Sequence, residues 1–225
     1  MRQLNAAITA FLRHPRTAAT AFYVAIAATV LRLLPLMLQF IGLDGTAVMR
    51  WVNIVYELDT LREALSVVVM LATALLWLVL SRMFPKAAQM MRYAAFALAA
   101  VMAVSAVWTL TESIFFPPIQ PLAQHDTATA ISSQVTAILG TANSMLALAV
   151  SLLLTVRYRG RLRQLGILVV AQFALSCVSV LAIFALTSLH AGMVWAGIVS
   201  GIHFVLQSAL SILLPYFQWR AVRGQ

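Results

Sequence analysis

The chain has 225 residues, of which 63% are hydrophobic and only 9% are charged. A soluble domain is about half apolar and a quarter charged, so a water-soluble globule of this composition could not cover itself with polar surface. The composition therefore excludes a soluble enzyme, a disordered chain and a nucleic-acid-binding domain, although the net charge is +9.

The first element in chain order is an amphipathic helix over residues 1–17. Apolar and basic residues fall on opposite faces of this segment when it is read at helical spacing. The apolar face carries Leu4, Ile8, Phe11 and Leu12, and the basic face carries Arg2, Arg13 and Arg16. A helix of this kind lies flat in the membrane interface, with its arginines toward anionic headgroups. The segment therefore predicts a surface helix.

Six long apolar stretches follow this helix. A membrane-spanning helix needs about 20 mostly apolar residues. The stretches that qualify are 18–41, 61–81, 93–116, 129–156, 165–188 and 193–216. We therefore expect an all-α membrane protein in which residues 18–219 form one bundle of six transmembrane helices. Residues 220–225 then form a short basic tail.

The positions of the charges predict the orientation of the bundle. Twelve of the 15 basic residues gather in four clusters that precede span 1, separate spans 2 and 3, separate spans 4 and 5, and follow span 6. All six acidic residues lie between the other ends of the spans or in the outer part of a span. Basic loops are retained in the cytoplasm. Both termini are therefore expected to be cytoplasmic in a multi-pass protein of the cell membrane, which in a bacterium is the inner membrane.

Several polar residues lie deep inside the predicted spans. His203 and Gln207 are four residues apart in span 6 and so share one face of a helix. Gln172 lies in span 5, and Asn143 borders a stripe of small residues in span 4. Small and polar residues pack transmembrane helices together, but large polar side chains also line cavities. Both interpretations remain open, and packing is the simpler one for the small residues.

Arg32 is the most unusual residue in the apolar stretches. It lies near the middle of span 1, where an arginine costs about 2.5–3.5 kcal/mol on the insertion scale. Glu112 is the one acidic residue well inside another span, and its depth differs from that of Arg32 by about 7 Å at 1.5 Å per residue. We therefore predict an Arg32–Glu112 pair, which is a structural clamp, part of a site for an anionic group, or a proton-coupled gate.

The sequence contains no motif for a metal, a cofactor or a nucleotide. Cys177 is the only cysteine, and His203 is the only histidine deep in a span. A bis-histidine haem or a zinc site would need further ligands at that depth. We therefore expect no cofactor and no nucleic-acid partner, and we assign no catalytic residue.

Three functions remain. The first is a permease or channel-like carrier for a small solute, with a substrate site drawn from Arg32, Glu112, Asn143, Gln172, His203 and Gln207. The second is an accessory or scaffold subunit of a larger membrane complex, which would bring a homo-oligomer or another membrane protein as its partner. The third is an intramembrane enzyme acting on a lipid-like substrate, with His203 and Glu112 as acid and base. Under each of these three functions, the protein is embedded in the lipid bilayer.

Overall fold

A computed structural model describes residues 10–12, 14–40, 59–115, 128–188 and 193–223. These residues form helices and no strand. The long helices are α2 (Pro15–Phe40), α4 (Asp59–Met83), α5 (Gln89–Phe115), α6 (Ala128–Arg157), α7 (Arg161–Ser188) and α8 (Met193–Arg223), and the 3-10 helix η1 is Lys86–Ala88. Six of these helices are long and apolar enough to cross a membrane. The expected all-helical class with six spans is confirmed.

The predicted boundaries at the two ends of the chain can be compared with the structure. Most of the surface helix expected over residues 1–17 lies outside the described residues, and residues 10–12 are helical. At the other end, α8 continues as far as Arg223. Residues 220–223 are therefore the last turn of a long helix, and Ala221 is buried in the core.

Local chemistry explains where two of the hairpins turn. Pro85 follows the end of α4, and the residue before a proline is disfavoured in the helical region. The chain therefore leaves the helix there and re-enters it through η1. Between α6 and α7, Gly160 has a φ of 66°, which is the left-handed region that glycine adopts without steric cost.

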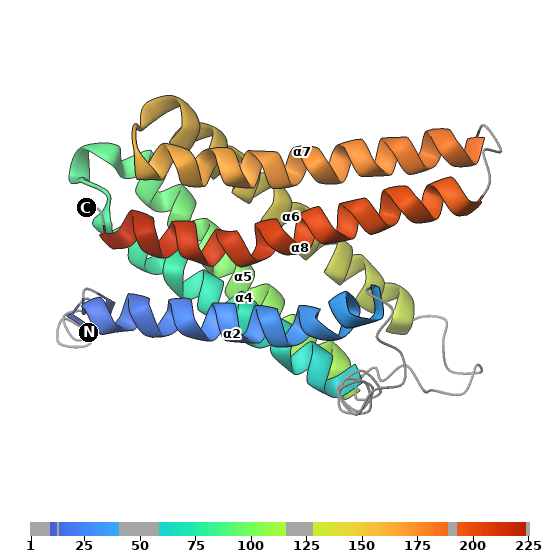
Figure 1. The fold of residues 1–225 in the computed structure, drawn as a ribbon. Helices are drawn as coiled ribbons and strands as arrows, with labels where there is room; N and C mark the ends of the chain where they lie inside the picture. The colour runs from blue at the N-terminus through green and yellow to red at the C-terminus, as the bar shows by residue number, and fades with distance from the viewer. Residues whose placement is uncertain (1–9, 13, 41–58, 116–127, 189–192, 224–225) are drawn as a thin grey trace.

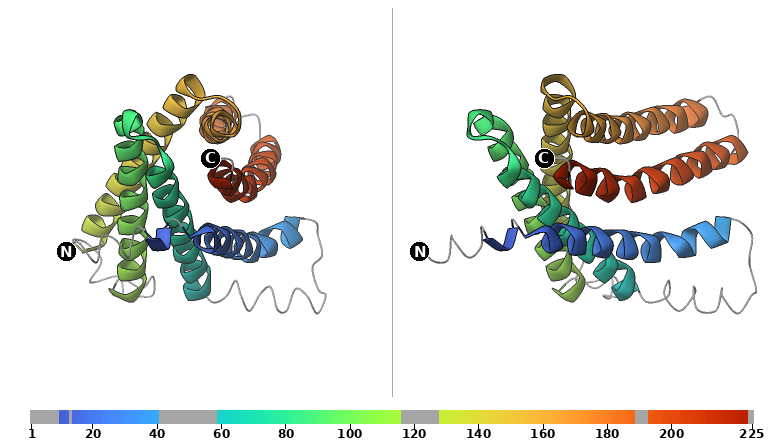
Figure 2. Two further views of the ribbon diagram at one scale, coloured as in Figure 1. Left: turned by 90° about the vertical axis from the view of Figure 1, so that its left-hand side faces the viewer. Right: turned by 60° about the vertical axis from the view of Figure 1, so that its left-hand side comes forward.

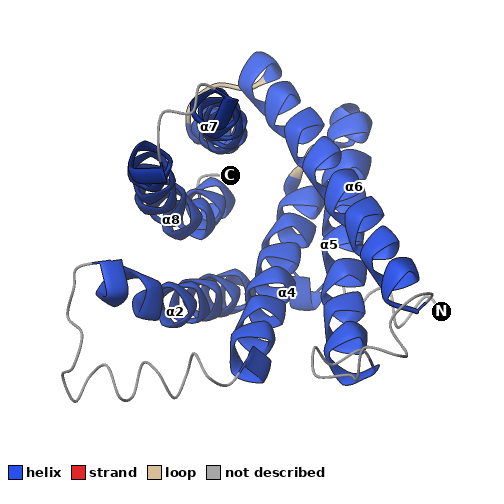
Figure 3. Cartoon of the chain, turned by 90° about the vertical axis from the view of Figure 1, so that its right-hand side faces the viewer, coloured by secondary structure: helices blue, strands red, loops and turns tan. Residues whose placement is uncertain are grey.

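The helices form a ring in chain order. Each long helix contacts the next one along the chain, and α8 closes the ring by packing on α2. Figure 3 shows this circular order when the bundle is viewed along α7 and α8. One further contact, between α4 and α8, crosses the ring. The contact divides the bundle into an α2–α4–α8 triangle and a wider ring made of α4 to α8.

Two groups of helices cross each other in this bundle. Helices α2, α8 and α7 run roughly side by side, while α4, α5 and α6 are tilted across them (Figures 1 and 2). The first turn of α2 and the last turn of α8 lie at the same end of the bundle (Figure 1). We call this end the terminal end and the other end the distal end.

The main core lies toward the terminal end. Its largest fully buried side chains include Leu80 of α4, Leu98 of α5, Leu154 of α6 and Leu165 of α7. Helices α6 and α7 approach closely there, because a β-carbon added to Gly166 would lie 2.6 Å from the backbone oxygen of Ser151. The helices are therefore held together tightly at the terminal end.

Burial decreases toward the distal end. On α6, Ser151 is buried, whereas Ser133, Gly140 and Ser144 are exposed. A β-carbon on Gly140 would meet no atom within 4 Å. Ser133, Gly140 and Ser144 are therefore less closely packed than Ser151 within the described part of the chain.

Candidate functional site

A pocket of about 270 Å³ lies within the wider ring of helices. Every helix from α4 to α8 contributes to its wall, and α2 contributes nothing. The polar lining residues are Thr73, Asn143, Ser144, Gln172, Ser176 and Gln207. The apolar ones are Trp77, Leu98, Met102, Ala147, Leu148, Val169, Phe173 and Leu214. We call this space the central pocket.

Three carboxamide side chains from three helices meet in the central pocket. They belong to Asn143 of α6, Gln172 of α7 and Gln207 of α8. The Oδ1 atom of Asn143 and the Oε1 atom of Gln207 are buried and have no hydrogen-bond partner among the described residues. A buried polar atom without a partner costs about 1–3 kcal/mol. Both oxygens therefore lack a hydrogen-bond partner among the described residues, although the residues that carry them line the pocket.

Gln172 is held in place by its neighbours. Its Nε2 atom donates to Oγ of Ser211 on α8 over 3.5 Å. The hydroxyl of Ser176, one turn further along α7, donates to the backbone oxygen of Gln172 over 3.1 Å. The first of these bonds links α7 to α8 beside the central pocket.

Pro215 interrupts the hydrogen-bond ladder of α8 next to this link. Proline has no backbone N–H, so the carbonyl four residues earlier, that of Ser211, loses its helical donor. Pro215 itself is fully buried. The backbone of α8 therefore presents an additional acceptor close to the carboxamides.

The central pocket lies near the middle of the helices. Asn143 and Gln207 are each about halfway along α6 and α8, and Thr73 is past the middle of α4. At 1.5 Å per residue, a point halfway along a 30-residue helix is about 22 Å from either end. If these helices span a bilayer, the carboxamides lie close to its midplane, where unsatisfied polar groups are most costly.

His203 lies one turn from Gln207 on α8 but does not line the central pocket. Its Nδ1 atom is buried and has no hydrogen-bond partner in the described part of the chain. His203 therefore lies next to Gln207 along α8 but outside the lining of the central pocket.

Arg32 lies elsewhere in the bundle. Its guanidinium Nη1 atom lies 3.4 Å from Oγ of Ser66, and the two residues join α2 to α4. Among the described residues, α2 and α5 do not contact each other. The predicted Arg32–Glu112 pair is therefore wrong: the two residues were matched in depth, but their helices are not neighbours.

Glu112 links α5 to α6 by hydrogen bonds near the distal end. Its carboxylate accepts hydrogen bonds from Ser132 at 2.5 Å and from Thr136 at 3.2 Å. The oxygen of Thr136 also accepts a bond from Nε1 of Trp108 over 2.9 Å. These contacts give Glu112 a clear structural role. The expected convergence of Arg32 and Glu112 with the carboxamides is not observed.

Sequence reasoning missed Thr73. This threonine is buried on α4 and lines the central pocket. A single threonine among alanines and leucines gave no periodic signal. Ser144 and Ser176 also line the pocket. Ser144 belongs to the stripe of small residues in span 4, and Ser176 lies four residues from Gln172 and so shares its helical face.

The central pocket is lined by uncharged side chains. None of the described residues that line it carries a charge, and no group of three metal-ligating side chains exists among the described residues. The lining offers hydroxyl and amide donors and acceptors beside an aromatic and aliphatic wall. Such a lining can hold a small uncharged molecule by hydrogen bonds.

Comparison with known proteins gave no match, whether by family model, by curated protein sequence or by solved structure.

Proposed function

We propose that the protein is a permease or channel-like carrier for a small, uncharged, hydrogen-bonding solute. The observation that carries this proposal is the meeting of Asn143, Gln172 and Gln207 in one pocket near the middle of the helices. Packing alone would favour side chains that satisfy one another, and two of these carboxamides keep buried oxygens without partners among the described residues.

The size and charge of the central pocket define the solute class. Its volume of about 270 Å³ lies just below the range of about 300–1,000 Å³ found for pockets that hold drug-sized ligands. A small amide or polyol fits this space. An ion is disfavoured because the described lining supplies no countercharge, and Arg32 is bonded to Ser66 instead.

The orientation follows from the basic clusters. Arg82, Arg159 and Arg220 lie at or beside the terminal ends of their helices. The positive-inside rule places such residues in the cytoplasm. We therefore propose that the terminal end is cytoplasmic and that the less tightly packed distal end faces the opposite side of the cell membrane.

A liposome assay tests the transport proposal. Protein reconstituted in liposomes is mixed with hyperosmotic urea, acetamide or glycerol, and solute entry is followed by stopped-flow light scattering. At least one of these solutes should enter faster than into protein-free liposomes. Rates equal to those of protein-free liposomes for all three would contradict a permease of this class.

Two matched variants assign the transport to the central pocket. Gln207→Leu removes a lining carboxamide and should lower the protein-dependent rate at least tenfold. Gln164→Leu makes the same chemical change at an exposed position on α7 that does not line the pocket, and it should leave the rate unchanged. Equal rates for the two variants would place the transport path elsewhere.

An accessory subunit is the second candidate, and the distal half of α6 favours it. Ser133, Gly140 and Thr141 are exposed there. Small and hydroxyl-bearing residues are enriched where membrane helices meet. Loss of a co-purifying membrane protein on Gly140→Ile, with unchanged solute entry, would support this second function.

The proposed intramembrane enzyme has less support. It needs His203 and Glu112 to act on one substrate, but α5 and α8 do not contact each other among the described residues. Glu112 also already accepts two hydrogen bonds from α6.

A further inference from the structure

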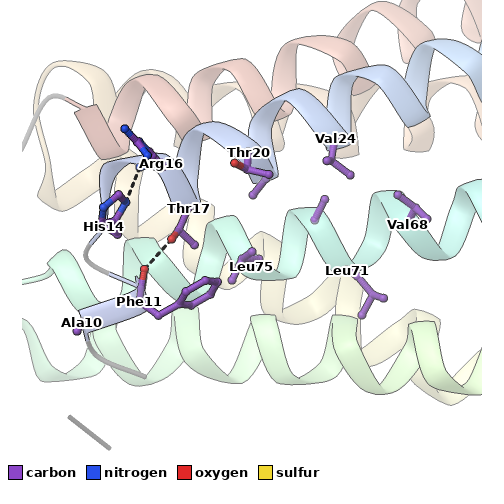
Figure 4. Close-up of a pocket in the computed structure, with 12 residues that line it drawn as sticks. Ala10, Phe11, His14, Arg16, Thr17, Thr20, Val24, Val68, Leu71 and Leu75 are labelled. Atoms are coloured by element: carbon purple, nitrogen blue, oxygen red, sulfur yellow. Dashed lines mark hydrogen bonds between the residues drawn. The ribbon is translucent and has the colours of Figure 1, made fainter. Parts of the chain in front are cut away.

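A long apolar groove runs between α2 and α4 at the terminal end of the bundle. Its volume is about 720 Å³. Val24, Val68 and Leu71 line one end, and His14 and Arg16 stand at the other (Figure 4). Arg16 and Val24 are eight residues apart, which is about 12 Å along a helix. The groove is therefore nearly as long as one leaflet of hydrocarbon, about 15 Å.

A second, basic pocket adjoins the charged end of this groove. It has a volume of about 310 Å³, and His14 lines both spaces. Arg82 of α4 and Arg223 of α8 enter the basic pocket from two further helices. The guanidinium carbon of Arg223 lies 4.3 Å above the ring of Trp219. Three side chains that can bind an anion therefore surround one space.

The groups around the basic pocket are well positioned for an anion. The Nδ1 atom of His14 accepts a hydrogen bond from the backbone N–H of Arg16. The proton of a neutral imidazole must then lie on Nε2, which can donate it. The hydroxyl of Thr17 fixes the same turn by donating to the backbone oxygen of Phe11 over 2.6 Å.

No nearby acid neutralises these arginines in the described part of the chain. The described acidic side chains, Glu63 and Glu112, lie toward the distal ends of α4 and α5. Leu12, Ala18 and Val79 form a small buried cluster beneath the pocket. The result is a cationic space with an apolar floor, which shares His14 with the apolar groove.

We propose that these two spaces together form a binding site for an anionic phospholipid of the leaflet that meets the terminal end. The phosphate lies between His14, Arg82 and Arg223, and one acyl chain lies in the groove along α2 and α4. Basic pockets between transmembrane helices bind lipid headgroups in this way. This site is separate from the central pocket and does not depend on the transport proposal.

Native mass spectrometry of the detergent-solubilised full chain tests the proposal. Dioleoylphosphatidylglycerol should bind at least tenfold more tightly than dioleoylphosphatidylcholine and should raise the melting temperature. Soluble glycerol phosphate should bind far more weakly than the anionic lipid, because it lacks the acyl chains. Equal binding of the two lipids, or equal binding of glycerol phosphate and the anionic lipid, would overturn the proposal.

Charge-matched variants separate a built site from general attraction. The double change Arg82→Gln with Arg223→Gln should weaken binding of the anionic lipid at least tenfold. Arg159→Gln with Arg163→Gln removes the same charge at exposed positions outside both spaces, and it should leave binding nearly unchanged. Equal losses in the two double variants would show that only net charge matters and would refute the site.

A second pair of variants tests the groove and does not disturb the arginines. Leu71→Trp fills the groove and should weaken binding of the anionic lipid by at least fivefold. Ile138→Trp adds the same bulk on α6, where the original side chain is 67% exposed, and should change nothing. Circular dichroism and gel filtration verify that each variant is folded. Unchanged binding in folded Leu71→Trp would exclude the acyl chain from the groove.

Discussion

Asn143 of α6 and Gln207 of α8 line the same pocket although, among the described residues, α6 and α8 do not contact each other. The space between them exists because the ring closes through α7 on one side and through α4 and α5 on the other. Both side chains keep a buried oxygen without a partner in the described part of the chain. Under the proposed function, a hydrogen-bonding solute would supply the partner that these oxygens lack among the described residues.

Asn143→Leu should therefore raise stability while lowering transport. The change removes a buried oxygen that has no partner among the described residues and replaces it with an apolar group, which we expect to stabilise the fold by about 1 kcal/mol. Unfolding in detergent measures the stability, and liposome swelling measures the transport. A loss of stability would identify Asn143 as a packing residue.

Gly140 of α6 and Gly166 of α7 should respond differently to alanine. At Gly166 the added carbon would lie 2.6 Å from atoms of both Ser151 and Thr155, so Gly166→Ala should cost about 1–3 kcal/mol. Gly140→Ala meets no atom within 4 Å and should be neutral or stabilising by up to about 1 kcal/mol. Equal effects on the free energy of unfolding would contradict the packing described for α6 and α7.

Arg32 and Glu112 should behave as independent residues. Their helices do not contact each other in the described residues, and substitutions at separated sites add within about 0.5 kcal/mol. A double-mutant cycle with Arg32→Ala and Glu112→Ala should therefore give a coupling energy near zero. The cycle of Glu112→Ala with Thr136→Val should give a coupling of about 0.5–2 kcal/mol, because these side chains share a hydrogen bond. Strong coupling in the first cycle would instead support an ion pair between Arg32 and Glu112.

Gln218→Met should stabilise the fold. The side chain of Gln218 is fully buried in α8, and both of its polar atoms lack partners among the described residues. Methionine has a similar volume and buries no strong polar group, so the free energy of unfolding should rise by about 1–2 kcal/mol. A fall in thermal stability would show that the amide of Gln218 is bonded in the folded protein.

The sequence was sufficient to locate the helices of this bundle. The stretches 61–81 and 129–156 fall within α4 and α6 and stop within two residues of their ends. Length and hydropathy decide such boundaries, because the membrane core imposes both. The end of α8 differs most from the prediction, because the arginines of its last turn resemble a polar tail by composition alone.

The sequence was not sufficient to identify the neighbours of each helix. Arg32 and Glu112 have compatible depths, but depth does not specify which apolar helices touch. By contrast, the inward faces of Gln172 and Gln207 follow from helical spacing alone, and the structure brings both to one pocket with Asn143. Thr73 could not be found because a lone threonine has no periodicity.

The accessibility of the central pocket to water tests the central claim most directly. In a Cys177→Ser background, Ser176→Cys places a thiol in the pocket, and Val178→Cys places one on the opposite, exposed face of α7. A membrane-impermeant, water-soluble methanethiosulfonate reagent should modify the first thiol within minutes and leave the second, which faces lipid, unmodified. Protection of both thiols would show that the pocket is dry and would contradict a solute pathway.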